Sequence, residues 1–317
     1  MSRWIERMAH MSHRTPSDPA SQPEHNRTML ERVRQNVRRL VNQATPRHIH
    51  ANPFGALPGN QRLIHHQRAA GKAVRIAAFI QRFLSRGGRG IRALERVGPR
   101  AQHRRLLRKH GWSEVFDVDI LDAEGPDLEL PIPNGSVLKK DIVGKDIENY
   151  DSMLVLSHFK GHPMGGYGGA LKQLSIGCAS TAGKVWIHSG GTTTDQNRFG
   201  DSLPAQDVFL AGMADAASAV VDYFRGSMAF VNVMKNLSVD CDCCAVAEDP
   251  CMKDIGILAS LDPVAVDQAC IDLIYAATDD PGQKHFIERV ESLHGIHTIE
   301  CAAALGVGSG EYELVEL

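Results

Sequence analysis

The segment from His158 to Gln173 holds the densest group of side chains that could do chemistry. It reads His-Phe-Lys-Gly-His-Pro-Met-Gly-Gly-Tyr-Gly-Gly-Ala-Leu-Lys-Gln. Imidazole titrates near neutral pH, so His158 and His162 are candidates for a general acid, a general base or a metal ligand. With Lys160 between them, these side chains form the predicted catalytic group. A third group for either role must come from elsewhere in the fold.

The glycines of the same segment predict an anion site. Glycine backbone lets N–H groups converge on an anion, and the start of a helix adds partial positive charge. Lys172 would then neutralise a phosphate or a carboxylate, and Lys184 could extend the site. The alternative is a tight turn with close helix packing, and the spacing matches no specific nucleotide motif. The predicted anion-binding glycines are Gly165, Gly166, Gly168 and Gly169.

A second candidate site is the run Cys241-Asp242-Cys243, which follows an expected strand. Two thiolates on one side of an extended segment can bind a soft metal, with Asp242 opposite. The run cannot supply four ligands to one cluster, so Cys178, Cys251 or a histidine would have to complete the set. The expected cofactor is an iron–sulfur cluster or a single transition metal. The alternative is a group of small, half-buried residues at a strand end.

The elements that must position these side chains alternate along the second part of the chain. Apolar runs of strand length alternate with helical periodicity, which is typical of an α/β fold with a mainly parallel sheet and helices on both faces. Asp262-Pro263 and Asp280-Pro281 are start signals for two of the helices. The expected strands are 152–157, 229–233 and 255–258, and the expected helices are 205–224, 263–276, 284–293 and 298–305.

The charge of the chain changes sign near His110. Residues 1–110 hold 23 basic and 5 acidic residues, a balance of +18, while residues 111–317 hold 12 and 32, a balance of −20. In the basic region, 32–41 and 69–80 show helical patterns, and no strand of useful length is expected. We therefore divide the chain into a basic region, 1–109, and an α/β domain, 110–317.

Three interpretations of the basic region stay open. It is a disordered or helical arm that binds nucleic acid, an organellar targeting segment, or a stretch translated in the wrong frame. In the first part Arg outnumbers Lys by 21 to 2, whereas Lys predominates in the second part. This contrast favours the wrong frame, and nucleic acid is an expected partner only if the region is genuine.

The composition also indicates the cellular compartment and the kind of partner. No apolar run reaches the length of about 18 residues that a membrane helix needs. The 7 cysteines are odd in number and unevenly spaced, which favours a reduced, cytoplasmic protein over a disulfide framework. The expected partner is a small-molecule or anionic ligand, and no membrane partner is expected.

Both candidate segments, together with 177–184 and 254–267, resemble the family of domain of unknown function 362, the uncharacterised iron–sulfur centre proteins. The resemblance runs from about His110 to the C-terminus. It implies an α/β fold and a bacterial or archaeal cytoplasmic protein, and it implies no settled reaction. Many relatives carry an inserted ferredoxin module, but 186–236 contains no cysteine here, so the iron–sulfur description does not transfer by that route. Residues 1–105 resemble no part of the family.

Three functions follow as hypotheses from these observations. The first is a metal-dependent or iron–sulfur-related redox enzyme that combines the His158–Gly169 segment with the cysteine run. The second is an enzyme or carrier that binds a phosphate or carboxylate without a metal. The third is a nucleic-acid-binding protein that uses the basic region.

Overall fold

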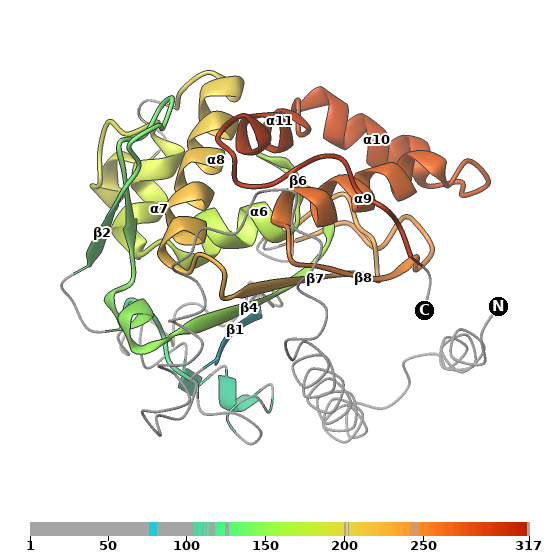
Figure 1. Cartoon of the computed structure of the whole chain (residues 1–317). Helices are drawn as coiled ribbons and strands as arrows, with labels where there is room; N and C mark the ends of the chain where they lie inside the picture. Colours follow the sequence, from blue (N-terminus) through green and yellow to red (C-terminus); the bar gives the residue numbers. More distant parts are fainter. Residues whose placement is uncertain are drawn as a thin grey trace. The chain divides into compact units, whose positions relative to one another are not determined.

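A computed structural model describes residues 76–80, 104–105, 107–109, 111, 113, 118–123, 127–199, 201, 203–241, 244 and 246–315. The chain divides into two compact units. Unit 1 comprises 1–72 and 97–118, and only a few of its residues are described. Unit 2 comprises 73–96 and 119–317 and contains the strands and the long helices of the described part (Figure 1).

The main sheet of unit 2 has the strand order β1-β4-β7-β8. Strands β1, β4 and β7 are parallel to one another, and β8 pairs antiparallel with β7 at the edge. Two smaller antiparallel pairs are β2 with β3 and β5 with β6. The strands are β1 Ile76–Ile80, β2 Leu128–Pro131, β3 Lys140–Val143, β4 Ser152–His158, β5 Lys160–His162, β6 Gly166–Gly168, β7 Met228–Met234 and β8 Gly256–Ser260.

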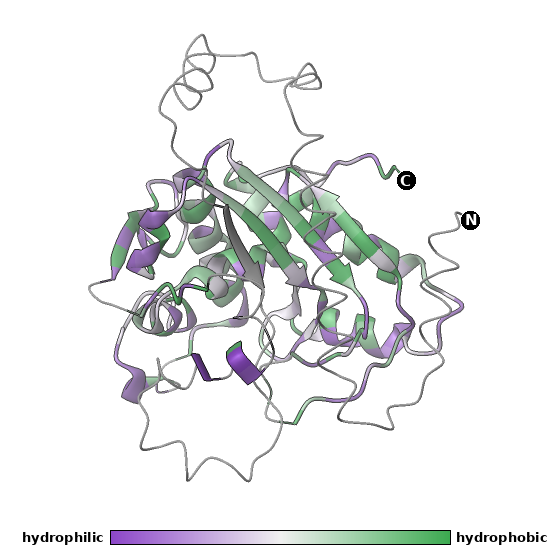
Figure 2. Ribbon diagram, turned by 90° about the horizontal axis from the view of Figure 1, so that it is seen from below, coloured by the Kyte–Doolittle hydropathy of each residue, from purple (hydrophilic) through white to green (hydrophobic). Residues whose placement is uncertain are grey.

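Helices pack on the main sheet, which confirms the α/β class. In Figures 1 and 2 the helices α6, α8 and α9 lie on one side of β4, β7 and β8. Burial along β4 alternates accordingly, and Met153, Val155 and Ser157 are buried while their neighbours are half-buried. The α-helices are α6 Ala170–Lys172, α7 Thr181–His188, α8 Gln206–Tyr223, α9 Pro263–Ala276, α10 Gln283–Ser292 and α11 His297–Ala304. Shorter helical turns are η2 Lys145–Asn149, η3 Gln173–Gly177 and η4 Gln196–Arg198.

The start signals predicted from the sequence succeed at one helix and fail at another. Asp262 caps α9, since its Oδ1 accepts hydrogen bonds from the backbone N–H groups of Val264 and Ala265. Asp280 was expected to do the same for the next helix, but α10 begins at Gln283. The Asp280 carboxylate instead accepts bonds from Gly282 and Lys253, so it ties a turn to a neighbouring loop.

Strand β1 contradicts one expectation. The pattern of 69–80 predicted a helix, and no strand was expected in the basic region. Ile76–Ile80 instead pairs in parallel with β4, with Ile76 opposite Ser152. Pairing with a neighbouring strand outweighs the helical preference of a run rich in Ala, and this preference is weak in any case.

Strands β4 and β7 end side by side, with His158 opposite Val233. Carboxyl ends of neighbouring parallel strands are where α/β sheets bind ligands. The hairpin β5–β6 follows β4 directly, and the segment that leads to Cys241 follows β7. Both candidate segments therefore start at the carboxyl ends of neighbouring strands, β4 and β7. Among the described residues, no helix has the length and apolar character needed to cross a bilayer.

Candidate functional site

A close backbone contact brings the two candidate segments together. The N–H group of Gly161, in β5, donates a hydrogen bond to the carbonyl of Ser238 at 2.8 Å. A side-chain carbon at Gly161 would lie 2.2 Å from the carbonyl oxygen of Val239. Only glycine permits this approach. It places the neighbours of Gly161 next to the segment that carries Cys241.

Four candidate site side chains converge at this contact. The Lys172 ammonium lies 3.8 Å from the Cys241 thiol. His162 forms a side-chain hydrogen bond with Cys241, and the charges of Lys160 and Lys172 act on its ring. All four side chains are buried. We call Lys160, His162, Lys172 and Cys241 the Lys–His–Cys cluster; it joins predicted residues from both segments.

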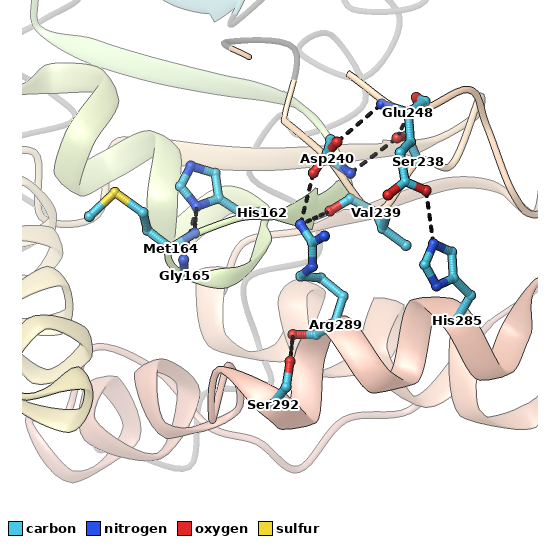
Figure 3. A network of polar contacts seen from close by, with 10 residues as sticks. All are labelled: His162, Met164, Gly165, Ser238, Val239, Asp240, Glu248, His285, Arg289 and Ser292. Atoms are coloured by element: carbon cyan, nitrogen blue, oxygen red, sulfur yellow. Dashed lines mark hydrogen bonds and ion pairs between the residues drawn. The ribbon is translucent and has the colours of Figure 1, made fainter. Parts of the chain in front are cut away.

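The bonds of His162 define its protonation. Its Nδ1 atom accepts the backbone N–H groups of Met164 and Gly165, at 3.1 and 2.9 Å (Figure 3). Since two donors point at Nδ1, the proton of the neutral ring belongs on Nε2, which is left to bond Cys241. Burial lowers the pKa of His162, and the charges of Lys172 and Lys160 lower it further against an opposing effect of Cys241. His162 is therefore a neutral donor toward the thiol at pH 7.

The segment before Cys241 is clamped by α10. Arg289 donates to the Val239 carbonyl at 3.0 Å and to the Asp240 carboxylate at 2.8 Å (Figure 3). The other Asp240 oxygen accepts the N–H of Glu248 at 3.1 Å, which closes the loop that begins at Cys241. Burial raises the pKa of Asp240, but the bonds from Arg289 and Glu248 outweigh it and hold that pKa below its usual value. These hydrogen bonds hold the backbone before Cys241 and so fix the position of its thiol in the cluster.

The helix start at Ala170 already holds an anion from this chain. The Asp267 carboxylate accepts the N–H groups of Ala170 and Leu171 at 2.7 and 3.0 Å. Asn232 and Tyr167 donate to the same carboxylate at 2.7 and 3.2 Å. Burial raises the pKa of Asp267 to about 6, although these donors oppose the shift. Asp267 therefore positions α6, and with it Lys172.

The predicted glycines differ in their surroundings, and of the four only Gly169 faces this carboxylate. A side-chain carbon at Gly169 would lie 2.4 Å from Asp267 Oδ1, so its absence admits the carboxylate. Gly166 and Gly168 form β6 and pair with β5, and the Gly165 N–H is bonded to His162. Their role in holding an external anion stays a prediction.

The other predicted site residues lie outside the cluster. His158 Nε2 lies 2.6 Å from the carbonyl of Lys235. Lys184 donates to the Ala179 carbonyl at 2.7 Å, close to the buried Asp141. Asp242 and Cys243 lie outside the described residues, so their predicted metal role is neither supported nor opposed.

The sequence reasoning missed the roles of Asp267, Asn232 and Arg289. Asp267 lies within the apolar run of α9, and a carboxylate there signals a buried polar contact. Asn232 gives the same signal within the apolar strand β7. Arg289 lies on a polar helix and carries no comparable signal.

The described residues do not by themselves make up the expected metal or iron–sulfur centre, and two of its three predicted ligands, Asp242 and Cys243, lie outside them. Among them, no group of three His, Cys, Asp or Glu side chains is arranged to hold a metal ion. A metal-bound histidine normally donates its other N–H to an acceptor, whereas His162 Nδ1 accepts two N–H groups. The ammonium of Lys172 beside Cys241 also opposes a further cation there. We therefore derive no chemistry through a metal.

The buried Asp141 carries a prediction of its own. It is fully buried, no hydrogen bond of its Oδ2 is found in the described part of the chain, and burial raises its pKa to about 7. The native state thus holds this proton more tightly than the unfolded chain, so stability falls as pH rises from about 4 to 7. Asp141→Asn should therefore be more stable than the wild type at pH 8, by about 2–4 kcal/mol, and similar at pH 4.

Urea unfolding of both proteins at pH 4, 6 and 8 checks this prediction. The Asn side chain keeps an oxygen for the N–H of Ile142, which now bonds Asp141 Oδ1. A variant that is less stable than the wild type at pH 8 would show that the carboxylate is needed in its charged form.

Comparisons with known proteins give one match. The family described as "Domain of unknown function (DUF362)" matches residues 65–272, which is more than half of the chain. The match includes β1 and the Lys–His–Cys cluster. It begins at residue 65, so the expectation that the resemblance starts near His110 and that no part of 1–105 resembles the family is wrong. No curated protein and no solved structure matches the chain.

Proposed function

The chain belongs to the family of domain of unknown function 362, and we propose that it is an enzyme that uses the Cys241 thiol on a small ligand bearing a carboxylate or phosphate. One observation carries this proposal. In a buried site at the carboxyl ends of two parallel strands, an ammonium and an imidazole N–H converge on one thiol. The reaction of the family is not known, so the proposal rests on the geometry of this chain.

The cluster favours the reactive form of a thiol. The thiolate is the nucleophile, and a cysteine beside a lysine ionises more readily than free cysteine. Lys172 supplies the positive charge, and the Nε2–H of His162 supplies a hydrogen bond that strengthens as sulfur becomes negative. Neither group has to move to do so, because the contact at Gly161 and the Asp267 carboxylate hold them in place.

The charge of the cluster sets the ligand class. Lys160 and Lys172 bring two ammonium groups to the site, and His162 stays neutral beside them. Low-dielectric surroundings strengthen the attraction of such groups for an anion. A carboxylate or phosphate on the ligand is therefore the feature that the site recognises.

We also propose that the protein works in a reducing compartment, the cytoplasm. Among the described residues, Cys178, Cys244, Cys251, Cys270 and Cys301 are free thiols. Disulfides form readily in secreted proteins, and a thiol-dependent site needs a compartment that keeps sulfur reduced.

Alkylation with a charged and a neutral reagent tests the thiol site. Iodoacetate and iodoacetamide both form an S–C bond and release iodide, but only iodoacetate carries a carboxylate. Cys241 should react at least about tenfold faster with iodoacetate than with iodoacetamide, after correction for the reagents' rates with free cysteine. Peptide mass spectrometry of the intact protein after timed quenching gives the two rates.

Cys251 is an internal control, because the charges of Asp280 and Glu248 act on it instead of a lysine. It should not prefer iodoacetate. Lys172→Met keeps the length of the side chain and should remove most of the preference at Cys241. Equal rates at Cys241 in the wild type, or no reaction there, would refute the proposed function.

A further inference from the structure

His188, the last residue of α7, has one ring nitrogen engaged and one available. Its Nδ1 lies 2.6 Å from the carbonyl oxygen of Lys184. A carbonyl can only accept, so Nδ1 carries the proton and Nε2 keeps its lone pair in the neutral ring. Within the part of the chain that the structure describes, no group donates a hydrogen bond to Nε2. His188 is thus a fixed acceptor.

Two phenylalanines orient the ring of His188. Phe209 of α8 stacks on it with ring centroids 5.1 Å apart, and Phe199 meets it edge-on at 5.3 Å. Phe199 is 50% exposed, so one wall of the imidazole is a side chain at the protein surface. The ring is therefore held in place and lies near solvent.

One face of α8 has residues near both His188 and the Lys–His–Cys cluster. Phe209 and Met213 are one helical turn apart and so lie on one face of the helix. The Met213 methyl group lies 3.8 Å from the point where Gly165 would carry a side-chain carbon. The N–H of Gly165 in turn bonds His162. Phe209, Met213 and Gly165 thus form a chain of neighbouring residues between His188 and His162.

The electrostatics agree with this placement. Burial lowers the pKa of His188, and the positive charges of Lys172 and Lys184 lower it further, against the bond to the Lys184 carbonyl. Of these two lysines, Lys172 belongs to the cluster. His188 therefore lies within reach of the cluster's field and is neutral at pH 7.

We infer that His188 selects the ligand of the proposed site by accepting a hydrogen bond at Nε2 from a hydroxyl group of that ligand. The inference rests on the proposed function and narrows its ligand class to small anions that also carry an O–H group. A hydroxy carboxylate and hydrogen phosphate belong to this class. Acetate and sulfate have the charge but lack the donor.

Two matched pairs of anions test the inference. Glycolate differs from acetate by one hydroxyl, and phosphate differs from sulfate mainly in its O–H group at pH 7. Each anion is titrated against alkylation of Cys241 by iodoacetamide, a neutral reagent that does not compete for the positive charges. Glycolate and phosphate should protect Cys241 at about fivefold lower concentration than acetate and sulfate, which is the worth of one hydrogen bond.

The variant His188→Phe keeps an aromatic ring against Phe209 and removes the acceptor. It should still be protected by all four anions, but with the two members of each pair now equal. His297→Phe, which alters a histidine bonded to Glu300, is the control and should keep the discrimination.

The outcomes separate the inference from the proposed function. If Cys241 prefers iodoacetate but glycolate and acetate protect it equally, His188 does not select the ligand and the inference is wrong. The same conclusion follows if His188→Phe keeps the discrimination. If Cys241 shows no preference for iodoacetate, the proposed function fails, and the inference fails with it.

Discussion

Replacing Asp267 by alanine should lower the free energy of unfolding by about 3–5 kcal/mol. The change removes one acceptor group and leaves four buried donors without it: the N–H groups of Ala170 and Leu171, the Tyr167 hydroxyl and the Asn232 amide. Each buried donor that loses its acceptor costs about 1–3 kcal/mol, although the costs do not simply add. Urea unfolding at pH 7 measures the loss.

Asp262→Ala is the matched control for this variant. Asp262 also accepts backbone N–H groups at a helix start, those of Val264 and Ala265, but it is only partly buried. Its loss should cost about 1–2 kcal/mol, the usual value for a helix cap. If the two variants lost the same stability, Asp267 would be an ordinary cap and not the buried anchor of α6.

The Asp267 carboxylate also shows why part of the site could not be read from the sequence. Four glycines before a helix start predict that the helix N-terminus holds an anion. The amides of Ala170 and Leu171 do hold one, but it comes from a residue that is far away along the chain. No local pattern distinguishes an anion supplied by the protein from one supplied by a ligand.

Local sequence patterns predicted the strands and helices whose stability depends mainly on their own residues. The strand over 229–233 and the helix over 263–276 were predicted from periodicity, and the structure has β7 at Met228–Met234 and α9 at Pro263–Ala276. Burial of apolar side chains stabilises both elements, and the apolar runs that are buried can be recognised in the sequence. Asp280 was misread because its acceptors serve a turn and a loop, which use the same residue types as a helix cap.

Long-range contacts explain the remaining differences. The helix predicted over 69–80 gives way to β1 because β4 offers a parallel partner, which no local propensity records. The meeting of Lys172 with Cys241 likewise joins segments 69 residues apart. Both candidate segments were recognised from their residue types. Their union depends on the glycine contact between β5 and the Val239 backbone, and it appears only in the folded chain.

This contact leads to the second large effect, in the variant Gly161→Ala. A methyl group at this position would lie 2.2 Å from the Val239 carbonyl oxygen and 2.5 Å from two further backbone atoms of that residue. Backbone cannot yield as a flexible side chain does, so the two segments must separate. We expect a loss of about 3 kcal/mol or more in unfolding free energy. The Cys241 preference for iodoacetate should be lost as well, since the thiol moves away from His162 and Lys172.

Gly168→Ala separates this clash from a general effect of alanine in the hairpin. Gly168 pairs with Lys160 across the same small sheet, yet among the described residues a methyl group there would meet only the Lys172 side chain, at an ordinary 3.7 Å. This variant should stay within about 1 kcal/mol of the wild type and keep the reactivity of Cys241. Because the two glycines share one hairpin, equal losses in both variants would mean that the hairpin tolerates no side chain. A large loss at Gly161 alone would identify the approach to Val239 as the contact that assembles the cluster.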